Sequence, residues 1–378
     1  MIYLDQAATS LQKPPEVCQA MLTACKTCAG YARSGHAPAL RAGEVVYQCR
    51  EAAAQLFSVD NPEQIIFTMN ATHALNLAIH GFCTPSTVVA VSSYEHNSVM
   101  RPLHALGCPL RILRSKLFDS ADFLREAERA IDAGVQIFII NHVSNVFGSI
   151  VPLEQLDAML QAYQIPLILD ASQSAGTIPI SVRRLRSLRA VCMPGHKGLL
   201  GPQGTGMLIL SNSDDLPRPL LQGGTGSASS SLEQPAFLPD RLESGTPNVP
   251  GIAGLHAGMK FLLEQGIDAI HRHEQDCIQT CIAVLRTIPN LEVFAAEEPE
   301  RQAGVLSIRI PNQPSEILAQ ALADQGVCVR GGLHCAPLAH QSAHTQTTGT
   351  IRLSVGPYNT RLEMQRTAEI LQELVGKM

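Results

Sequence analysis

Short apolar segments alternate along this chain with longer stretches of helical periodicity, and this alternation limits the possible folds more than any other feature. The segments span residues 65–68, 88–91, 137–141, 167–170, 190–193 and 207–210. Most are rich in Val, Ile and Leu, as are strands that are buried on both faces of a parallel sheet. We therefore predict an α/β fold with a buried, mainly parallel sheet.

Polar residues or glycines follow most of these segments. Asn141 and Asp170 end two of them, and the turn Gly195-His196-Lys197 follows another. In open α/β sheets, ligands bind beyond the carboxyl ends of the strands. We therefore expect the chemistry of the protein to lie where these residues meet.

The chain also divides into two parts. Residues 221–250 are rich in Gly, Ser and Pro, which is typical of a long loop between domains. A helical pattern at 253–285 and strand-like segments at 291–294, 305–310 and 351–355 follow. We predict a large domain over residues 1–250 and a small C-terminal α+β domain over residues 251–378, with the first ~15 residues expected on the small domain.

Composition excludes several classes of protein. The 28 Lys and Arg residues against 33 Asp and Glu residues give a net charge of -5, which argues against nucleic-acid binding. No apolar run is long enough to span a membrane without a charge or a turn residue, and no signal-peptide pattern is present at the start. We therefore expect a cytoplasmic protein whose 11 cysteines stay reduced.

A lysine and a carboxylate are expected to converge at the sheet edge. Lys197 lies in a Gly-rich turn and Asp170 ends an apolar strand, while neither common nucleotide-binding glycine motif is present. A lysine that forms a Schiff base and a carboxylate that keeps a pyridine nitrogen protonated are what pyridoxal phosphate requires. Ala71 and Thr72 begin a helical pattern whose N–H groups could bind a phosphate. His96 could stack on the ring or be an ordinary structural histidine.

Cys335 follows a Gly-Gly pair in residues 330–335. A zinc site with His334, His340 and His344 is not favoured because the spacing is irregular, and an inert packed thiol is the plainer alternative. Against that alternative, the two glycines predict a mobile backbone. The arginine and histidine of the segment could also place cations beside the sulfur, and the thiolate is its reactive form. We therefore select Cys335 as a candidate nucleophile.

Together, the motifs of this chain resemble the class V aminotransferase family of fold-type I pyridoxal-phosphate enzymes, and within it the cysteine desulfurases and selenocysteine lyases. The resemblance covers nearly the whole chain. Its motifs lie at residues 3–10, 71–72, 95–98, 144–148, 170–173, 195–197, 243–248, 330–336, 352 and 358–360. It implies a mainly parallel seven-stranded sheet in the large domain, bound pyridoxal phosphate and a homodimer.

The resemblance also implies roles around the cofactor. Lys197 would form the Schiff base, Asp170 would pair with the pyridine nitrogen, and Gln173 would hydrogen-bond to the phenolic oxygen. His96 would stack on the ring. The phosphate would be surrounded by Ala71, Thr72, the loop beside Ser172, His196, and Thr246 from the other subunit.

For the substrate, the resemblance implies that Asn145 and Arg352 bind the carboxylate of an amino acid. Cys335 would take the sulfur of cysteine as a persulfide, and L-alanine would leave. An acceptor protein for the sulfur is a further expected partner. The sequence contains no residue set for which we predict a metal site.

Three positions depart from the pattern of the family. Leu333 stands where members with the Arg-x-Gly-His-His-Cys-Ala pattern carry histidine, Asn97 stands where a second histidine is frequent, and His73 stands where glutamate is common. The preference between cysteine and selenocysteine therefore stays open. The alternatives are a selenocysteine lyase, an aminotransferase or epimerase in which Cys335 is incidental, and a sulfur- or selenium-delivery partner of a metalloenzyme-maturation protein.

Overall fold

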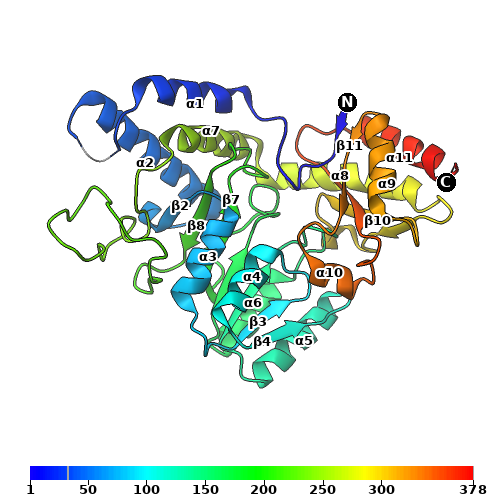
Figure 1. Ribbon diagram of the computed structural model, residues 1–378, viewed down its shortest axis with the longest axis horizontal. Coiled ribbons are helices and arrows are strands. Elements are labelled where there is room, and N and C mark those ends of the chain that lie inside the picture. The colour runs from blue at the N-terminus through cyan, green and yellow to red at the C-terminus, as the bar shows by residue number, and fades with distance from the viewer. Residues whose placement is uncertain (32–33, 378) are drawn as a thin grey trace.

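A seven-stranded sheet of order β2-β8-β7-β6-β5-β3-β4 forms the centre of the larger domain (Figure 1). The computed structural model describes residues 1–31 and 34–377. The strands are β2 Ile65–Thr68, β3 Val89–Ser92, β4 Leu110–Leu113, β5 Ile137–Asn141, β6 Leu167–Asp170, β7 Leu188–Pro194 and β8 Gly206–Leu210. Strands β4, β3, β5, β6 and β7 are parallel, whereas β8 is antiparallel to both β7 and β2. The predicted α/β fold with a mainly parallel sheet is confirmed.

Helices cover both faces of this sheet. They are α1 Pro15–Thr27, α2 Ala37–Phe57, α3 Ala71–Phe82, α4 Asn97–Leu106, α5 Ser120–Asp132, α6 Leu153–Ala162 and α7 Val249–Gln265, with the short helix η1 at Pro62–Gln64. Successive side chains of a strand point to opposite faces. Accordingly, Phe138 and Ile140 of β5 pack with α2, α5, α6 and α7, whereas Ile137 and Ile139 pack with α3 and α4. In the described part of the chain, no helix is both long and apolar enough to cross a membrane.

The smaller domain is built on a four-stranded antiparallel sheet of order β12-β13-β10-β9. Its strands are β9 Glu292–Phe294, β10 Val305–Arg309, β12 Arg330–Gly332 and β13 Thr350–Ser354. Its helices are α8 Ile267–Leu285, α9 Ser315–Asp324, α10 Pro337–Ser342 and α11 Arg361–Val375, with the short helix η2 at Pro299–Arg301. Apolar residues of α8, α9, α11 and the sheet form one separate buried cluster.

The first residues of the chain lie on the small domain and then cross to the large one. Strand β1 (Ile2–Tyr3) pairs in parallel with β11 (Val327–Cys328), and Leu4 belongs to the small-domain core. Further on, the Ser10 amide donates to the carbonyl of His196 on the large domain (3.0 Å). The N-terminal segment therefore bridges both domains.

Two details of the expected domain division need correction. Helix α7 packs against α1 and α2, and its apolar residues join the core beneath the large sheet, so the packing favours a boundary near Gly266 rather than at residue 250. The Gly- and Ser-rich segment 221–250 is therefore a loop of the large domain and no linker. Leu238 and Leu242 pack into the core of that domain, and Glu243 pairs with Arg50 of α2.

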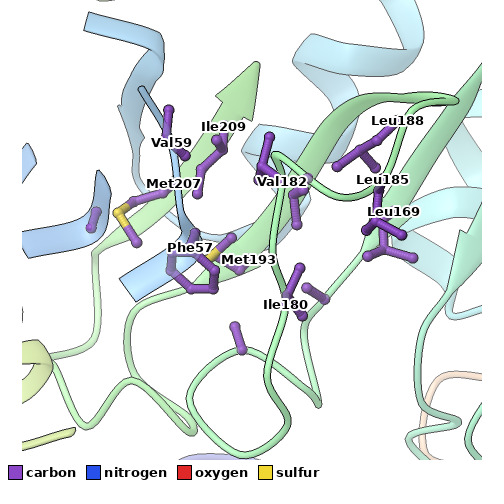
Figure 2. Packing of buried hydrophobic residues seen from close by; sticks show 14 of the residues in the cluster. Phe57, Val59, Leu169, Ile180, Val182, Leu185, Leu188, Met193, Met207 and Ile209 are labelled. Carbon is purple, nitrogen blue, oxygen red and sulfur yellow. The ribbon is translucent and has the colours of Figure 1, made fainter. Parts of the chain in front are cut away.

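A substitution of Phe57, at the end of α2, tests the packing of the large-domain core. Phe57 is 2 % exposed, and its ring lies near Met193 and Met207 (Figure 2). Because its removal leaves a cavity, Phe57→Ala is expected to lower the free energy of unfolding by about 3–5 kcal/mol in a urea titration. Leu362→Ala, at an exposed position of α11, is the control and is expected to change it by less than about 0.5 kcal/mol. Equal effects of the two substitutions would contradict this packing.

Candidate active site

A cavity of about 250 Å³ lies at the carboxyl ends of the large-domain strands and is closed by residues of the small domain. Nine residues predicted for the site line it: Ala71, Thr72, His96, Asn145, Asp170, Gln173, His196, Lys197 and Arg352. Ala7 and Ala8 of the N-terminal segment and Arg330 and His334 of the small domain also line it. The cavity therefore collects residues from three distant parts of the chain.

Lys197 lies in the turn after β7. The pKa of its amine is lowered to about 8, mainly by burial and also by the neighbouring Arg352, while Asp170 acts in the opposite direction. An amine with this pKa is partly neutral near neutral pH, which a lysine needs in order to act as a nucleophile.

Asp170 ends β6 and is buried. Its Oδ1 accepts hydrogen bonds from the amide of Ser172 (2.9 Å) and from the Ser172 hydroxyl. Burial raises the pKa of the carboxyl group, while these hydrogen bonds and Lys197 lower it. A buried carboxylate with fixed geometry can hold a cationic nitrogen of a ligand.

Neutral imidazoles lie on two sides of the cavity. His96 caps α4, where its Nδ1 contacts the Ser98 hydroxyl (2.7 Å) and accepts from the Ser98 amide (3.1 Å). Burial lowers the pKa of His96 to about 4, and the cation of Lys197 contributes to this shift. His196 has its pKa lowered to about 4 mainly by burial, and its Nδ1 lies 3.1 Å from the Thr9 hydroxyl.

The N-terminus of α3 faces the same cavity. The side chain of Asn70 caps this helix by accepting from the amide of His73 (2.9 Å), and Ala71 and Thr72 form the first turn. Backbone N–H groups and the helix dipole at such an end favour an anionic group. A Cβ on Gly206 of β8 would lie 2.8 Å from the Asn70 backbone, so glycine lets this end approach the sheet closely.

The donor set fits pyridoxal phosphate. The cavity supplies an amine with a lowered pKa, a buried carboxylate, a neutral imidazole and a helix N-terminus. Gln173, however, already donates its Nε2 to the carbonyl of Ala7 (3.1 Å), so only the second hydrogen of that amide is free for a cofactor oxygen.

Arg352 and Asn145 also line the cavity. Arg352 is 1 % exposed; its Nη1 donates to the carbonyl of Asn145 (3.0 Å) and its Nη2 to Oδ1 of Asp5 (2.8 Å). The Asn145 side chain donates to the carbonyl of His334 (2.8 Å). In the described chain, the Arg352 Nε and the Asn145 Oδ1 are buried without a hydrogen-bond partner. An unpaired donor on a buried guanidinium is suited to bind a carboxylate.

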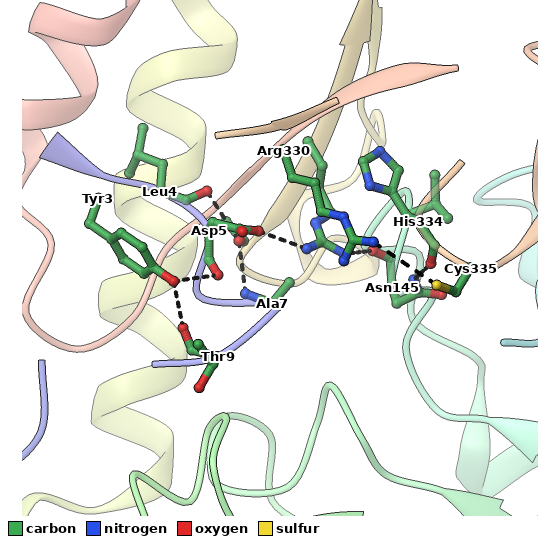
Figure 3. Close-up of polar contacts among 12 residues, drawn as sticks. Tyr3, Leu4, Asp5, Ala7, Thr9, Asn145, Arg330, His334 and Cys335 are labelled. Atoms are coloured by element: carbon green, nitrogen blue, oxygen red, sulfur yellow. Dashed lines mark hydrogen bonds and ion pairs between the residues drawn. The ribbon is translucent and has the colours of Figure 1, made fainter. Parts of the chain in front are cut away.

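Cys335 is exposed and lies beside the cavity rather than in its wall. Nη2 of Arg330, a residue of the wall, lies 4.0 Å from its Sγ (Figure 3). The carbonyl of Cys335 accepts from the amide of Asn97 (2.8 Å), which attaches the turn to the start of α4.

Two expectations about the surroundings of Cys335 are wrong. His334 does not supply a cation, because burial lowers its pKa to about 2 and its Nε2 contacts the carbonyl of Thr350 (3.0 Å). The two glycines do not form a mobile segment either, since Gly331 and Gly332 belong to β12 and pair with β13. Among the described residues, no group of three or more His, Cys, Asp or Glu side chains is placed to hold a metal ion.

Thr246, like Cys335, is a predicted site residue that does not line the cavity. It is exposed on the loop before α7 and does not line the cavity of its own chain.

The sequence analysis missed the roles of Asp5 and Glu95. Asp5 pairs with Arg352, and buried Glu95 links the ends of β3 and β5 by accepting from the Ser92 hydroxyl (2.6 Å) and the Asn141 amide (3.0 Å). Both lie within recognised motifs, but Arg352 and Asn141, to which they bind, are distant in sequence.

Comparisons with known proteins agree with this geometry. The family model for aminotransferase class-V matches residues 2–367. A probable cysteine desulfurase of Methanothermobacter thermautotrophicus is 31% identical, over 99% of this chain and 95% of the relative. A cysteine desulfurase of Escherichia coli is 28% identical, over 99% of this chain and 93% of that protein. The apo structure of a cysteine desulfurase from Thermococcus onnurineus has 29% identity and a TM-score of 0.90, covering 100% of this chain and 95% of its own. The chain therefore belongs to the class V aminotransferase family.

Proposed function

We propose that this protein is a pyridoxal-phosphate-dependent cysteine desulfurase, which converts L-cysteine to L-alanine and leaves the sulfur on Cys335 as a persulfide. The observation that carries the proposal is the assembly of Lys197, Asp170 and Arg352 around one cavity, with Cys335 at its edge. The named relatives span 99% of the chain, and they favour cysteine over the alternative substrates.

The cofactor would be held by groups of known chemistry. Lys197 would bind it covalently, Asp170 would pair with the pyridine nitrogen, and His96 would cover one face of the ring. Gln173 would use its free amide hydrogen on the phenolic oxygen. Ala71, Thr72 and His196 would surround the phosphate. When bound, pyridoxal phosphate withdraws electrons from the substrate and thereby weakens its bond to the Cα proton.

Lys197 would also move the proton of the substrate. Its amine, with a pKa of about 8, can accept the Cα proton and return a proton later. Arg352 would bind the substrate carboxylate through its unpaired Nε, with help from the second hydrogen of the Asn145 amide. These contacts would fix the amino acid between Lys197 and Cys335.

Cys335 would act as the nucleophile. Its thiolate attacks the sulfur of the bound cysteine, so that a sulfur–sulfur bond forms and the bond between Cβ and sulfur breaks. The carbon keeps the electron pair of that bond and is protonated to the methyl group of alanine. Nη2 of Arg330 lies 4.0 Å from Sγ and can donate a hydrogen bond to the sulfur. Because Cys335 is exposed, its persulfide is accessible to an acceptor protein.

We further propose a homodimer. Leu22 on α1, Leu40 and Tyr47 on α2, Met69 and Phe237 are exposed apolar residues. Helices α1 and α2 and the 221–250 loop lie on one side of the large domain (Figure 1). Thr246 on this loop would complete the phosphate site of the partner subunit, as the family resemblance implies.

We also propose a cytoplasmic location, because all eleven thiols are unpaired and Cys335 must stay reduced.

The first test is Cys335→Ala. This variant is expected to lose alanine formation from cysteine, because the sulfur has no acceptor. It is expected to keep the absorbance of bound pyridoxal phosphate, because the thiol does not line the cofactor cavity. Cys25→Ala, which removes another exposed thiol, is the control. Undiminished alanine formation by Cys335→Ala would show that Cys335 is an ordinary thiol. Alanine formation from selenocysteine, measured in parallel with the same variants, tests the alternative of a selenocysteine lyase.

A second test follows from the pKa of Lys197. Only the neutral amine reacts with the cofactor, so the rate of covalent uptake by the apo-protein is expected to rise about tenfold per pH unit below pH 8 and to level off above it. The absorbance of the bound cofactor measures this rate, and Lys197→Ala is expected to show no covalent uptake. A rate that keeps rising toward the ordinary pKa of lysine would contradict the assigned environment.

The third test concerns the dimer. Sedimentation is expected to give twice the 40.6 kDa mass of the chain. Thr246→Ala is expected to weaken pyridoxal phosphate binding without separating the subunits, because it removes one hydrogen bond to the phosphate. A monomer that retains full cofactor occupancy and activity is incompatible with this arrangement.

A further inference from the structure

The buried charge of Arg352 is compensated from the far end of the chain. Arg352 lies on β13 and lines the cavity, whereas its ion-pair partner Asp5 is not part of the cavity wall. A guanidinium that is 1 % exposed is unfavourable without a counter-ion. Asp5 therefore neutralises Arg352 from outside the cavity and leaves the interior free for a substrate.

Asp5 is itself fixed by the N-terminal segment (Figure 3). The Tyr3 hydroxyl donates to the carbonyls of Asp5 (3.2 Å) and Thr9 (2.9 Å). Ser354 binds the segment at two further points, since its amide donates to the carbonyl of Leu4 (2.7 Å) and its hydroxyl accepts from the amide of Ala7 (2.9 Å). Ser354 follows Arg352 by two residues on the same strand. The segment that carries Asp5 is thus bound directly to the strand that carries Arg352.

Arg352 extends this constraint to the turn of Cys335. Its Nη1 donates to the backbone carbonyl of Asn145 (3.0 Å), and the side-chain amide of Asn145 donates to the carbonyl of His334 (2.8 Å). His334 and Cys335 have positive φ angles of 49° and 59°, a conformation that non-glycine residues adopt at a cost. Such a turn persists only where its surroundings hold it, and the Asn145 hydrogen bond is one of the contacts that do so.

We propose that Asp5 is a positioning residue, which fixes the guanidinium of Arg352 for the substrate carboxylate and, through Asn145, the turn that carries Cys335. The inference rests on the proposed function, because it takes Arg352 as the carboxylate ligand and Cys335 as the nucleophile. Loss of the Asp5 carboxylate loosens both groups together. It leaves the cofactor in place, because Asp5 does not line the cavity around Lys197 and Asp170.

The experiment compares Asp5→Asn and Asp5→Ala with Asp276→Asn in the loaded enzyme. Asp276 forms a matched aspartate–arginine pair with Arg361 (2.6 Å), but on the exposed surface of the small domain. The readouts are KM and kcat for cysteine, the absorbance of the bound cofactor, and the rate at which iodoacetamide alkylates Cys335 without substrate. Mass spectrometry of the Cys335 peptide resolves that rate from those of the other thiols.

Asp5→Asn is expected to raise KM about tenfold, since the ion pair that fixes the Arg352 guanidinium becomes a weaker hydrogen bond to an uncharged amide, and to change kcat less. Alkylation of Cys335 is expected to accelerate, with Asp5→Ala showing larger effects, while the cofactor absorbance and all values for Asp276→Asn stay unchanged. Asp5→Asn keeps the side-chain shape and thus provides the test even where Asp5→Ala does not fold.

The proposal is overturned if KM or the alkylation rate of Asp5→Asn equals that of the wild type, or if the cofactor is lost. The alkylation comparison needs no turnover. If the wild-type enzyme forms no alanine from cysteine, the proposed function is contradicted. The alkylation rates of Cys335 in the wild type and in Asp5→Asn would still test the positioning role of Asp5 separately.

Discussion

The parallel direction of β3, β5, β6 and β7 is the constraint on which the site depends. Parallel strands end at the same edge of a sheet, so Asn141, Asp170 and the turn of Lys197 meet there although they are distant in sequence. Apolar side chains on both faces fix the register of these strands. The polar residues that follow the strands are consequently held by the packing of the whole large domain.

Burial adjusts the ionisation of the groups at this edge. It lowers the pKa of Lys197 to about 8 and that of His96 to about 4, so the cavity holds an amine that can lose its proton and an imidazole that stays neutral. Two further cations come from the small domain, where Arg352 is compensated by Asp5 and Arg330 lies near Cys335. In the proposed function, the large domain would provide the cofactor chemistry, and the small domain would provide carboxylate recognition and the nucleophile.

Local patterns in the sequence predicted much of the large domain. Six of its seven strands were recognisable as short apolar runs, and the residues after them line the cavity. The missed strand, β4, lies at the sheet edge and carries the exposed Arg111, so its apolar signal is weak. Strand β12 was missed because its Gly-Gly sequence suggests flexibility. A Cβ on Gly331 would lie 3.2 Å from the backbone of Glu316, so this glycine allows close packing of α9.

Other features depend on contacts between distant segments and have no local signal. His334 seemed able to provide a cation beside Cys335, but only the fold shows that its ring is buried against Thr350. The pairing of Asp5 with Arg352 joins residues 347 positions apart. The boundary near Gly266 likewise follows from the packing of α7 on α1 and α2, and the sequence of α7 does not reveal it.

The central claim is that Cys335 receives the sulfur of the substrate. Its most direct test is mass spectrometry of the protein after one turnover with L-cysteine and without a reductant, with alanine quantified in the same sample. The account predicts one added sulfur atom on the peptide that contains Cys335 and an equal amount of alanine. Alanine formed with the added sulfur on another cysteine, or with no sulfur on the protein, would contradict it.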